Sequence, residues 1–260
     1  MAAPIELSIV IPAYNEAPSI EATLESVLAY LQRQSYQSEL IVVDDGSKDE
    51  TSSILDKYAT GHPRVRVLRN QQNLGKGGSV KRGMLAARGK FIFFMDADLS
   101  APIEELGGAF AALSRGSHPV LIGSRRISGA RIERRQPRLR ECLGFGFTLL
   151  ARGMLSPAIL DFTCGFKGFR RDAGRRLFQL QQCENWAFDA EILYLARLMN
   201  TPVLQYPVRW EHKKNSRVRF PRDIYRTLAA LMRIRWMAAR AFRHHAAASA
   251  VAGGQNSGEH

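Results

Sequence analysis

KFIFFMDADLS, residues 90–100, places two carboxylates, Asp96 and Asp98, directly after an unbroken run of apolar residues. A short apolar run of this kind, bounded by polar residues, predicts a strand that is buried on both faces. A carboxylate without a partner is costly in such surroundings, so these two acids require a compensating cation or hydrogen-bond donors. The stretch therefore predicts a buried strand with a charged site at its end.

The same pattern recurs along the first hundred residues. Short apolar runs alternate with segments in which apolar residues recur at helical spacing. Continuous apolar strands that alternate with helices indicate a mostly parallel sheet flanked by helices, which is an α/β, Rossmann-like fold. The predicted strands are LSIVIPA (7–13), ELIVVDD (39–45), RVRVLRN (64–70) and KFIFFM (90–95), and the predicted helices cover about 18–34, 50–59 and 78–89.

Polar side chains follow each of these four strands. Parallel sheets bind ligands beyond the carboxyl ends of their strands, so the four loops are expected to converge on one site. The alternative is that the acids merely cap the helices that follow, since Asp and Ser are common N-cap residues. The residues concerned are Asn15 and Glu16, Asp44 and Asp45, Asn73 to Lys76, and Asp96 and Asp98.

The composition limits the class of protein. The 260 residues are 45% hydrophobic and carry a net charge of +13, which favours an anionic partner such as nucleic acid, a phosphorylated substrate or an anionic membrane. Three cysteines without CxxC spacing argue against a disulfide framework and a zinc site and favour a reducing compartment. The N-terminus does not have the pattern of a signal peptide, and no apolar run approaches the roughly 20 residues of a spanning helix. We therefore expect a soluble or peripheral protein.

The spacing of Asp96 and Asp98 is compatible with a metal site. A DxD triplet is common by chance, but here it follows a buried strand at the ligand-binding edge. Carboxylate oxygens are the ligands that Mg²⁺ and Mn²⁺ prefer, and both ions commonly keep bound phosphate and water. The expected cofactor is therefore Mg²⁺ or Mn²⁺, which would compensate the two acids and bridge them to a diphosphate.

Several motifs, taken in order, resemble one known family. VIPAYNE, VVDDGSKDET, NLGKGGSVKRGM and FMDADLS look like the nucleotide-binding half of family-2 inverting glycosyltransferases with the GT-A fold. DFTCGFKGFRR (161–171) and NWAFDAEILYLA (185–196) are similar to the dolichyl-phosphate glucosyltransferase branch. The resemblance covers about residues 5–220. It implies a hexosyltransferase that moves glucose from UDP-glucose to a polyprenyl phosphate.

The resemblance also implies roles for individual residues. Asp44 would bind the nucleobase and Asp45 would support the same loop, while Lys76 would approach the base or the donor phosphates. Asp96 and Asp98 would hold the ribose-diphosphate through the metal, because the leaving diphosphate needs a cation. The nucleoside pocket would be lined by Pro12, Tyr14 and Glu16.

Two cationic residues are candidates for the acceptor phosphate. Arg125 matches the arginine of the family's GSR motif, and a guanidinium suits bidentate binding of phosphate. Lys167 would be a second cationic contact, unless it is an ordinary surface lysine. Arg125 belongs to the arginine-rich segment 123–141, most of which can equally be a solvated surface. These arginines are not interleaved with aromatic residues, which argues against a nucleic-acid partner.

Asp189 and Glu191 form an acidic pair at the start of a predicted helix. Asp189 could simply be the N-cap. In the family this pair lies on the acceptor side, where a hydroxyl acceptor would require a general base. A phosphate acceptor, with a second pKa of about 6, is already largely ionised and would need the acids only for orientation.

The sequence predicts a catalytic domain followed by a separate C-terminal segment. Residues 1–215 are expected to form the GT-A domain, with a nucleotide-sugar half (1–100) and an acceptor half (101–215). Residues 216–245 are predicted to form a basic amphipathic helix that either lies on an anionic membrane or packs on the domain. Its predicted apolar face is Ile224, Leu228, Leu231, Ile234 and Phe242, and its predicted basic face is Arg222, Arg226, Arg233 and Arg240. Residues 246–260 are predicted to be a disordered tail.

Three features depart from the branch. Eukaryotic members begin with a membrane-spanning helix that this sequence does not show, and the family's Gly-Ser-Lys lid appears as Asn215, Ser216 and Arg217. Gly168 stands where a larger apolar residue is usual.

Together with the resemblance, the sequence predicts metal-dependent inverting transfer of a sugar to a lipid phosphate at the cytoplasmic membrane face. The alternatives are another donor, such as GDP-mannose or UDP-GlcNAc, or a lipid or soluble hydroxyl acceptor.

Overall fold

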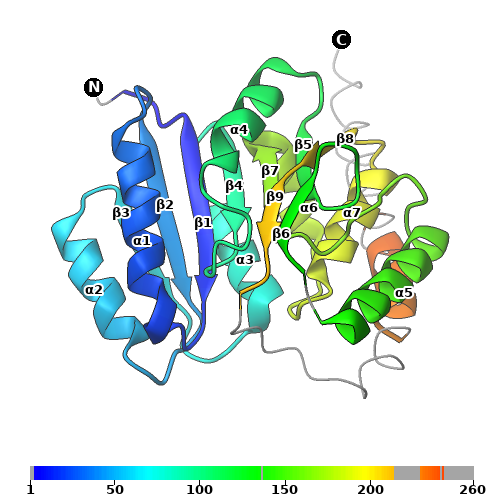
Figure 1. Ribbon diagram of the computed structural model, residues 1–260, viewed down its shortest axis with the longest axis horizontal. Coiled ribbons are helices and arrows are strands. Elements are labelled where there is room, and N and C mark those ends of the chain that lie inside the picture. The colour runs from blue at the N-terminus through cyan, green and yellow to red at the C-terminus, as the bar shows by residue number, and fades with distance from the viewer. Residues whose placement is uncertain (1–2, 136, 214–228, 241, 243–260) are drawn as a thin grey trace, which may run out of the picture.

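A mixed sheet with helices on both faces forms the body of the protein (Figure 1). The computed structural model describes residues 3–135, 137–213, 229–240 and 242. The main sheet has the strand order β3-β2-β1-β4-β7-β5-β8, and β6 pairs with β9 in a separate two-stranded sheet. The strands are β1 (Leu7–Ala13), β2 (Ser38–Asp44), β3 (Val65–Arg69), β4 (Phe91–Met95), β5 (Val120–Ser124), β6 (Arg131–Arg134), β7 (Phe166–Arg170), β8 (Val203–Pro207) and β9 (Arg209–Glu211). The helices are α1 (Ala17–Gln32), α2 (Thr51–Gly61), α3 (Gly75–Ala86), α4 (Glu105–Arg115), α5 (Arg138–Met154), α6 (Arg171–Leu180) and α7 (Phe188–Leu198).

The strand register brings the predicted loops to one edge. β1 pairs in parallel with β2 so that Ala13 lies opposite Asp44 at the carboxyl ends of both strands. β4 is parallel to β1, whereas β7 is antiparallel to β4 and pairs Met95 with Phe166. The turn before β7 therefore lies at the same edge as the loop after β4. The predicted mostly parallel α/β architecture is confirmed.

Two apolar cores, one on each face, hold the sheet between its helices. Successive side chains of a strand point to opposite faces, so Ile9 packs in one core and Val10 in the other. The first core contains buried residues of α1 and α4, and the second contains residues of α3, α6 and α7. Burial on both faces explains why these strands are apolar without alternation.

Gly168, which departs from the family's pattern, lies in the middle of β7 opposite Phe93 of β4. A Cβ atom at this position would lie 2.5 Å from two ring carbons of Phe93. The Phe93 ring thus occupies the space that a larger residue at 168 would take. The two positions share one volume in the core.

Residues 229–240 are helical and pack on the second core. Leu231, Ile234 and Ala238 are buried there, so the described part of the predicted C-terminal helix follows the packing alternative. Several predictions concern residues outside the described ones. These are the helix positions at 222–228, the altered lid (215–217) and the tail (246–260). Within the described residues, no helix is both long enough and apolar enough to cross a membrane.

Candidate active site

Asp96 is held at the end of β4 by the turn that precedes β7. Its backbone N–H donates to the carbonyl of Gly165 at 3.1 Å. A Cβ atom on Gly165 would overlap the carboxylate of Asp96, so the side chain lies directly against the glycine backbone. Only glycine leaves room for the carboxylate in this position.

Asp98 lies beside Asp96 on the same loop. One of its oxygens accepts the backbone N–H of Ser100 at 2.9 Å. Burial, together with the neighbouring Asp96 carboxylate, raises the pKa of Asp98 above its ordinary value. The two acids are therefore short of positive charge. No three potential metal-ligating side chains (His, Cys, Asp or Glu) come together within the described residues.

Lys76 supplies the nearest positive charge. Its Nζ lies 2.6 Å from Oδ1 of Asp96 in a partly exposed ion pair. Burial disfavours the charge, but the carboxylates of Asp96 and Asp189 outweigh it and raise the pKa of Lys76. The lysine therefore stays positively charged beside Asp96.

The glycines around Lys76 allow this placement. Gly75, with φ +83°, begins α3, and a Cβ atom on it would lie 2.6 Å from the carbonyl oxygen of Glu184. A Cβ atom on Gly77 would lie 2.5 Å from the carbonyl oxygen of Cys183. The start of α3 therefore packs backbone to backbone against the 183–185 loop, and glycine leaves the space for this contact.

Lys167 is buried, contrary to its predicted contact with an acceptor phosphate. Its Nζ donates to the carbonyls of Phe162 at 3.2 Å and Cys164 at 2.7 Å, and to Oδ1 of Asp189 at 2.6 Å. Three acceptors compensate the ammonium, as a buried lysine requires. In this arrangement Lys167 supports the turn before Gly165 and has no face open to a phosphate.

Asp189 is not the N-cap of α7, because that position is Ala187. Its side chain instead turns into the protein toward Lys167, and burial raises its pKa against the opposing effect of Lys167. Glu191 is buried as well, and accepts the backbone N–H groups of Gln182 at 3.0 Å and Cys183 at 2.7 Å. Both acids hold neighbouring backbone or side chains in place.

Arg125 forms a bidentate ion pair with Asp161, a buried residue that the sequence analysis did not single out. Its Nε lies 2.7 Å and its Nη2 2.8 Å from the two carboxylate oxygens, and Nη2 also donates to Thr163. The guanidinium lies over the Trp210 ring. The predicted bidentate geometry is present, but the guanidinium binds Asp161. Asp161 is the first residue of the DFTCG stretch, four residues before Gly165.

The arginine-rich segment around Arg125 is mostly solvated. Arg126, Arg131, Arg134 and Arg135 are exposed, as the alternative interpretation of this run expected. Nothing in their described contacts directs them toward Asp96.

Asp44 organises the loop that follows β2. Its Oδ1 accepts the backbone N–H of Ser47 at 3.0 Å, and its Oδ2 accepts the hydroxyl of Ser52 at 2.5 Å. The side chain is almost completely buried. Both oxygens thus build the loop at the predicted nucleoside pocket, whereas the N-cap of α2 is Glu50.

Asp45 supports a different loop from the one predicted. Its carboxylate accepts the side-chain amide of Asn70 at 2.7 Å and the backbone N–H groups of Leu74 at 2.8 Å and Gly75 at 2.9 Å. Asp45 therefore fixes the approach to α3, and with it the position of Lys76. No role was predicted for Asn70 from the sequence. Its place at the end of β3, at the binding edge of the sheet, is the signal that could have identified it.

The end of β1 lies against the Asp44 loop. The backbone N–H of Asn15 donates to the Ser47 hydroxyl at 3.0 Å, and that of Glu16 donates to Thr51 Oγ1 at 2.8 Å. Pro12, Tyr14 and Glu16 are all partly exposed at this edge. The structure thus brings Pro12, Tyr14 and Glu16 to the same edge as the Asp44 loop. A second group consists of Lys76, Asp96, Asp98, Lys167 and Asp189. Arg125 lies at the end of β5.

Comparisons with known proteins show which family and which relatives this chain resembles. The family model described as Glycosyl transferase family 2 matches residues 8–178. The chain is 39% identical over 220 residues to dolichyl-phosphate beta-glucosyltransferase ALG5C of Trichomonas vaginalis, covering 81% of this chain and 65% of that protein. It is 34% identical over 225 residues to the human dolichyl-phosphate beta-glucosyltransferase, covering 82% of this chain and 69% of the relative. The chain thus spans about two thirds of the length of these relatives.

Solved structures share the fold. Glucosyl-3-phosphoglycerate synthase of Mycobacterium tuberculosis in complex with UDP has a TM-score of 0.64 at 23% identity, covering 89% of this chain and 80% of that one. The same enzyme in complex with Mn²⁺, UDP and glucosyl-3-phosphoglycerate has a TM-score of 0.62 at 22% identity, with the same coverage.

The Arg125–Asp161 pair yields a prediction about stability. Replacing Asp161 with Asn leaves a largely buried guanidinium without its counter-ion, and we expect the free energy of unfolding at pH 7 to fall by roughly 3–5 kcal/mol. Arg125 lowers the pKa of Asp161 although burial opposes this. The carboxylate therefore stabilises the fold above its unfolded pKa of about 3.9 and loses that contribution as the pH falls through the lower folded value.

Urea unfolding of wild type and Asp161→Asn at several pH values measures this difference. The difference in free energy of unfolding between wild type and Asp161→Asn should narrow below about pH 4. Asp56→Asn is the matched control, because Asp56 forms an exposed ion pair with Arg69 and its loss should change stability by less than about 1 kcal/mol. Equal effects of the two substitutions would contradict the structural role of Asp161.

Proposed function

The chain belongs to glycosyl transferase family 2, and we propose that it transfers glucose from UDP-glucose to a polyprenyl phosphate such as dolichyl phosphate, with inversion at the anomeric carbon. The predicted family and the GT-A fold are confirmed by the comparisons. The choice of donor and acceptor is supported by the similarity to dolichyl-phosphate beta-glucosyltransferases. The observation that carries the proposal is the Asp96 and Asp98 pair, with Lys76, at the edge where the loops after β1 and β2 also end.

The carboxylate pair fits a divalent cation. Asp96 forms an ion pair with Lys76, and Asp98 has a raised pKa beside it, so one lysine faces two carboxylates and the group is short of positive charge. Asp96 and Asp98 would hold Mg²⁺ or Mn²⁺, and diphosphate and water would complete its shell. When bound, the cation supplies positive charge for the diphosphate that leaves the sugar. The structurally similar glucosyl-3-phosphoglycerate synthase was crystallised with Mn²⁺ and UDP together, which supports a metal in this proposal.

The protein's own residues would position the donor. Pro12, Tyr14 and Glu16 line the proposed nucleoside pocket, and Asp44 shapes its loop through Ser47 and Ser52. Lys76 reaches the acidic group on a flexible side chain and can exchange its contact with Asp96 for donor phosphate oxygens. The positive charge of Lys76 at this place would stabilise the developing negative charge of the leaving group.

The engagement of the acidic pair supports a phosphate acceptor. Asp189 pairs with Lys167 and Glu191 accepts backbone N–H groups, so in this arrangement neither is presented as a general base. A phosphate nucleophile needs no such base, because its second pKa is about 6. We assign Lys167 and Asp189 to positioning the turn before Gly165. We retain Arg125, at the end of β5, as the candidate cation for an incoming phosphate, which would share the guanidinium with Asp161.

The place of reaction in this proposal is the cytoplasmic face of a membrane. A net charge of +13 supports association with an anionic lipid surface. The polyprenyl phosphate would present its headgroup there, within reach of a peripheral protein.

Asp98→Asn tests the metal site. The substitution removes one charge from the proposed ion's shell, so we expect the turnover of UDP-glucose with Mn²⁺ to fall by about 10²-fold or more. The melting temperature should change little, because an Asn side-chain oxygen can still accept the backbone N–H of Ser100 that Asp98 accepts. Asp172→Asn, an exposed acid in the first turn of α6, is the control. Near-normal transfer by Asp98→Asn, or full wild-type activity in excess chelator, would contradict the assignment.

A comparison of polyprenyl phosphate with the matching polyprenol tests the acceptor. Wild type should glucosylate the phosphate and leave the alcohol unreacted. Glu191→Gln keeps an oxygen that can accept a backbone N–H, so transfer to the phosphate should fall less than about tenfold. Use of the alcohol, with a loss of about 10² to 10⁴-fold in Glu191→Gln, would instead indicate a general base and a hydroxyl acceptor.

A further inference from the structure

Large apolar side chains are exposed in one region of the protein. They come from α5, from the loop before α7 and from the helix at 229–240. Single exposed apolar residues are ordinary, but a concentrated group marks an interaction surface. The group, named here the apolar face, comprises Phe145 (59% exposed), Leu149 (59%), Trp186 (45%), Met232 (59%) and Trp236 (61%).

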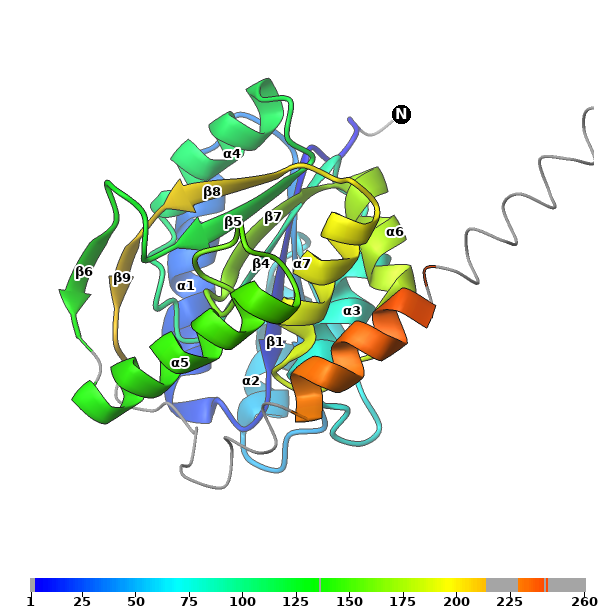
Figure 2. The same ribbon diagram turned by 90° about the vertical axis from the view of Figure 1, so that its right-hand side faces the viewer.

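The members of the apolar face lie on elements that contact one another. Phe145 and Leu149 are four residues apart on α5, and Met232 and Trp236 are four apart on the other helix, so each pair shares a side of its helix. The Phe147 ring on α5 packs edge-on against Trp186, with centroids 5.5 Å apart. Figure 2 shows α5 and the orange helix on the same side of the molecule, both close to α7.

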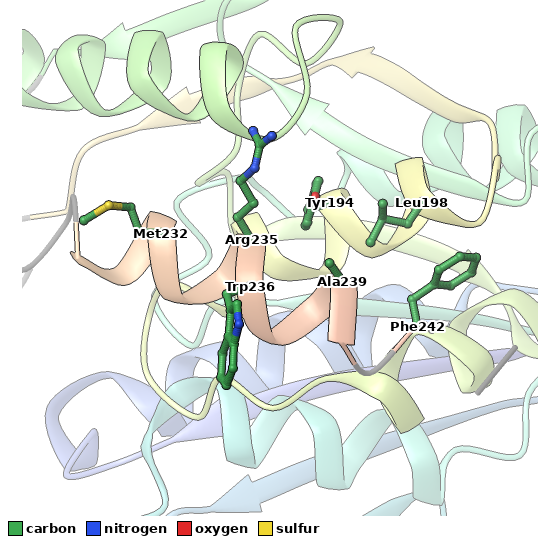
Figure 3. A pocket seen from close by; sticks show the side chains of 7 residues that line it. All are labelled: Tyr194, Leu198, Met232, Arg235, Trp236, Ala239 and Phe242. Atoms are coloured by element: carbon green, nitrogen blue, oxygen red, sulfur yellow. The ribbon is translucent and has the colours of Figure 1, made fainter. Parts of the chain in front are cut away.

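A hydrogen bond and a hollow complete this region. Arg235 Nη1 donates to the carbonyl of Met154 at 2.9 Å and so ties the helix at 229–240 to the end of α5. A hollow of about 630 Å³ lies between that helix and α7 (Figure 3). The polar groups of its lining are the tyrosine hydroxyl, one guanidinium and one indole N–H. The lining consists of Tyr194, Leu198, Met232, Arg235, Trp236, Ala239 and Phe242.

Positive charge surrounds the apolar face. Residues 229–240 contain three arginines and no acidic residue, and Arg233, Arg235 and Arg240 are all exposed. Arg240 lies over the Trp236 ring with 5.4 Å to its centroid, and Arg126 lies over Phe145 at 5.5 Å. Glu141, in the first turn of α5, is an acid close enough to act on Arg126, and the arginines outnumber it. Exposed aromatic rings with arginines beside them suit the headgroup region of an anionic bilayer.

We propose that the apolar face inserts into the interface of a bilayer that contains anionic lipids, with its arginines at the lipid headgroups. A second copy of the chain is a less suitable occupant, because a twofold contact would bring the same arginines of both copies together. The inference deepens the proposed function and rests on it, since a membrane surface is where a polyprenyl phosphate is found. It also gives the helix at 229–240 two roles, because Leu231 and Ile234 face the core while Met232 and Trp236 face outward.

Tryptophan fluorescence can test the insertion directly. The chain has three tryptophans, of which Trp186 and Trp236 belong to the apolar face and Trp210 is buried. Vesicles of phosphatidylcholine with phosphatidylglycerol, some carrying brominated acyl chains, contain no polyprenyl phosphate and no donor. We expect the full chain to bind them, with bromine quenching of Trp186 and Trp236 that is lost in the Trp186→Phe/Trp236→Phe variant.

Variants of the face and of its surroundings sharpen the test. Phe145→Ser/Leu149→Ser/Met232→Ser should weaken vesicle binding at least about tenfold, because it removes three exposed apolar side chains without touching the core. Ile132→Ser, an exposed apolar residue on β6, is the control and should bind as wild type does. Arg233→Gln/Arg240→Gln should reduce the preference for anionic over neutral vesicles by about tenfold or more.

The outcomes separate this inference from the proposed function. Unchanged vesicle binding in the triple variant, or a concentration-dependent dimer in light scattering that the same variant abolishes, would overturn the insertion. Glucose transfer to a short-chain, water-soluble prenyl phosphate would still be measurable in that case. Conversely, a chain that binds vesicles through this face but transfers no glucose to any prenyl phosphate would refute the proposed function alone.

Discussion

The buried ammonium of Lys167 is the interaction on which the site depends. A lysine inside a protein is costly unless its charge and its three donors are satisfied. Here the carbonyls of Phe162 and Cys164 and the carboxylate of Asp189 satisfy them, and the turn from 161 to 165 is thereby fixed. Gly165 ends that turn against Asp96 and accepts its backbone N–H. The position of the proposed metal ligand is thus set by residues that are themselves buried.

The sheet topology makes this arrangement possible. β7 enters antiparallel between β4 and β5, so the turn before it meets the carboxyl end of β4. On the other side, Asp45 fixes the start of α3 and hence the approach of Lys76. The two lysines therefore have different roles. Lys167 is buried in an ion pair with Asp189 that stabilises the fold, whereas Lys76 is partly exposed beside Asp96. The half of the site that binds charge is therefore held from two sides, by the turn before β7 and by the loop after β2.

Much of this could be predicted from the sequence, because it depends on local patterns. The apolar strands, the helices between them and the loops rich in acids identified the sheet and its binding edge. The partners of those acids could not be predicted, since they come from distant parts of the chain. Lys167 and Asp189 are 22 residues apart and Arg125 and Asp161 are 36 apart, so only the tertiary structure shows that these charges neutralise each other. A lysine or arginine motif predicts a cation, but whether it meets a ligand or a buried carboxylate depends on the fold.

The most direct test of this account is the binding of UDP, with and without Mn²⁺, by wild type and Gly165→Ala in titration calorimetry. A methyl group at 165 must displace the Asp96 carboxylate, whereas Gly146→Ala, at a glycine with open space around it on α5, is the matched control. The account predicts that Mn²⁺ strengthens UDP binding by wild type and by Gly146→Ala, and that Gly165→Ala loses about tenfold or more of that gain while its metal-free affinity changes little. An undiminished effect of Mn²⁺ in a folded Gly165→Ala protein would contradict it.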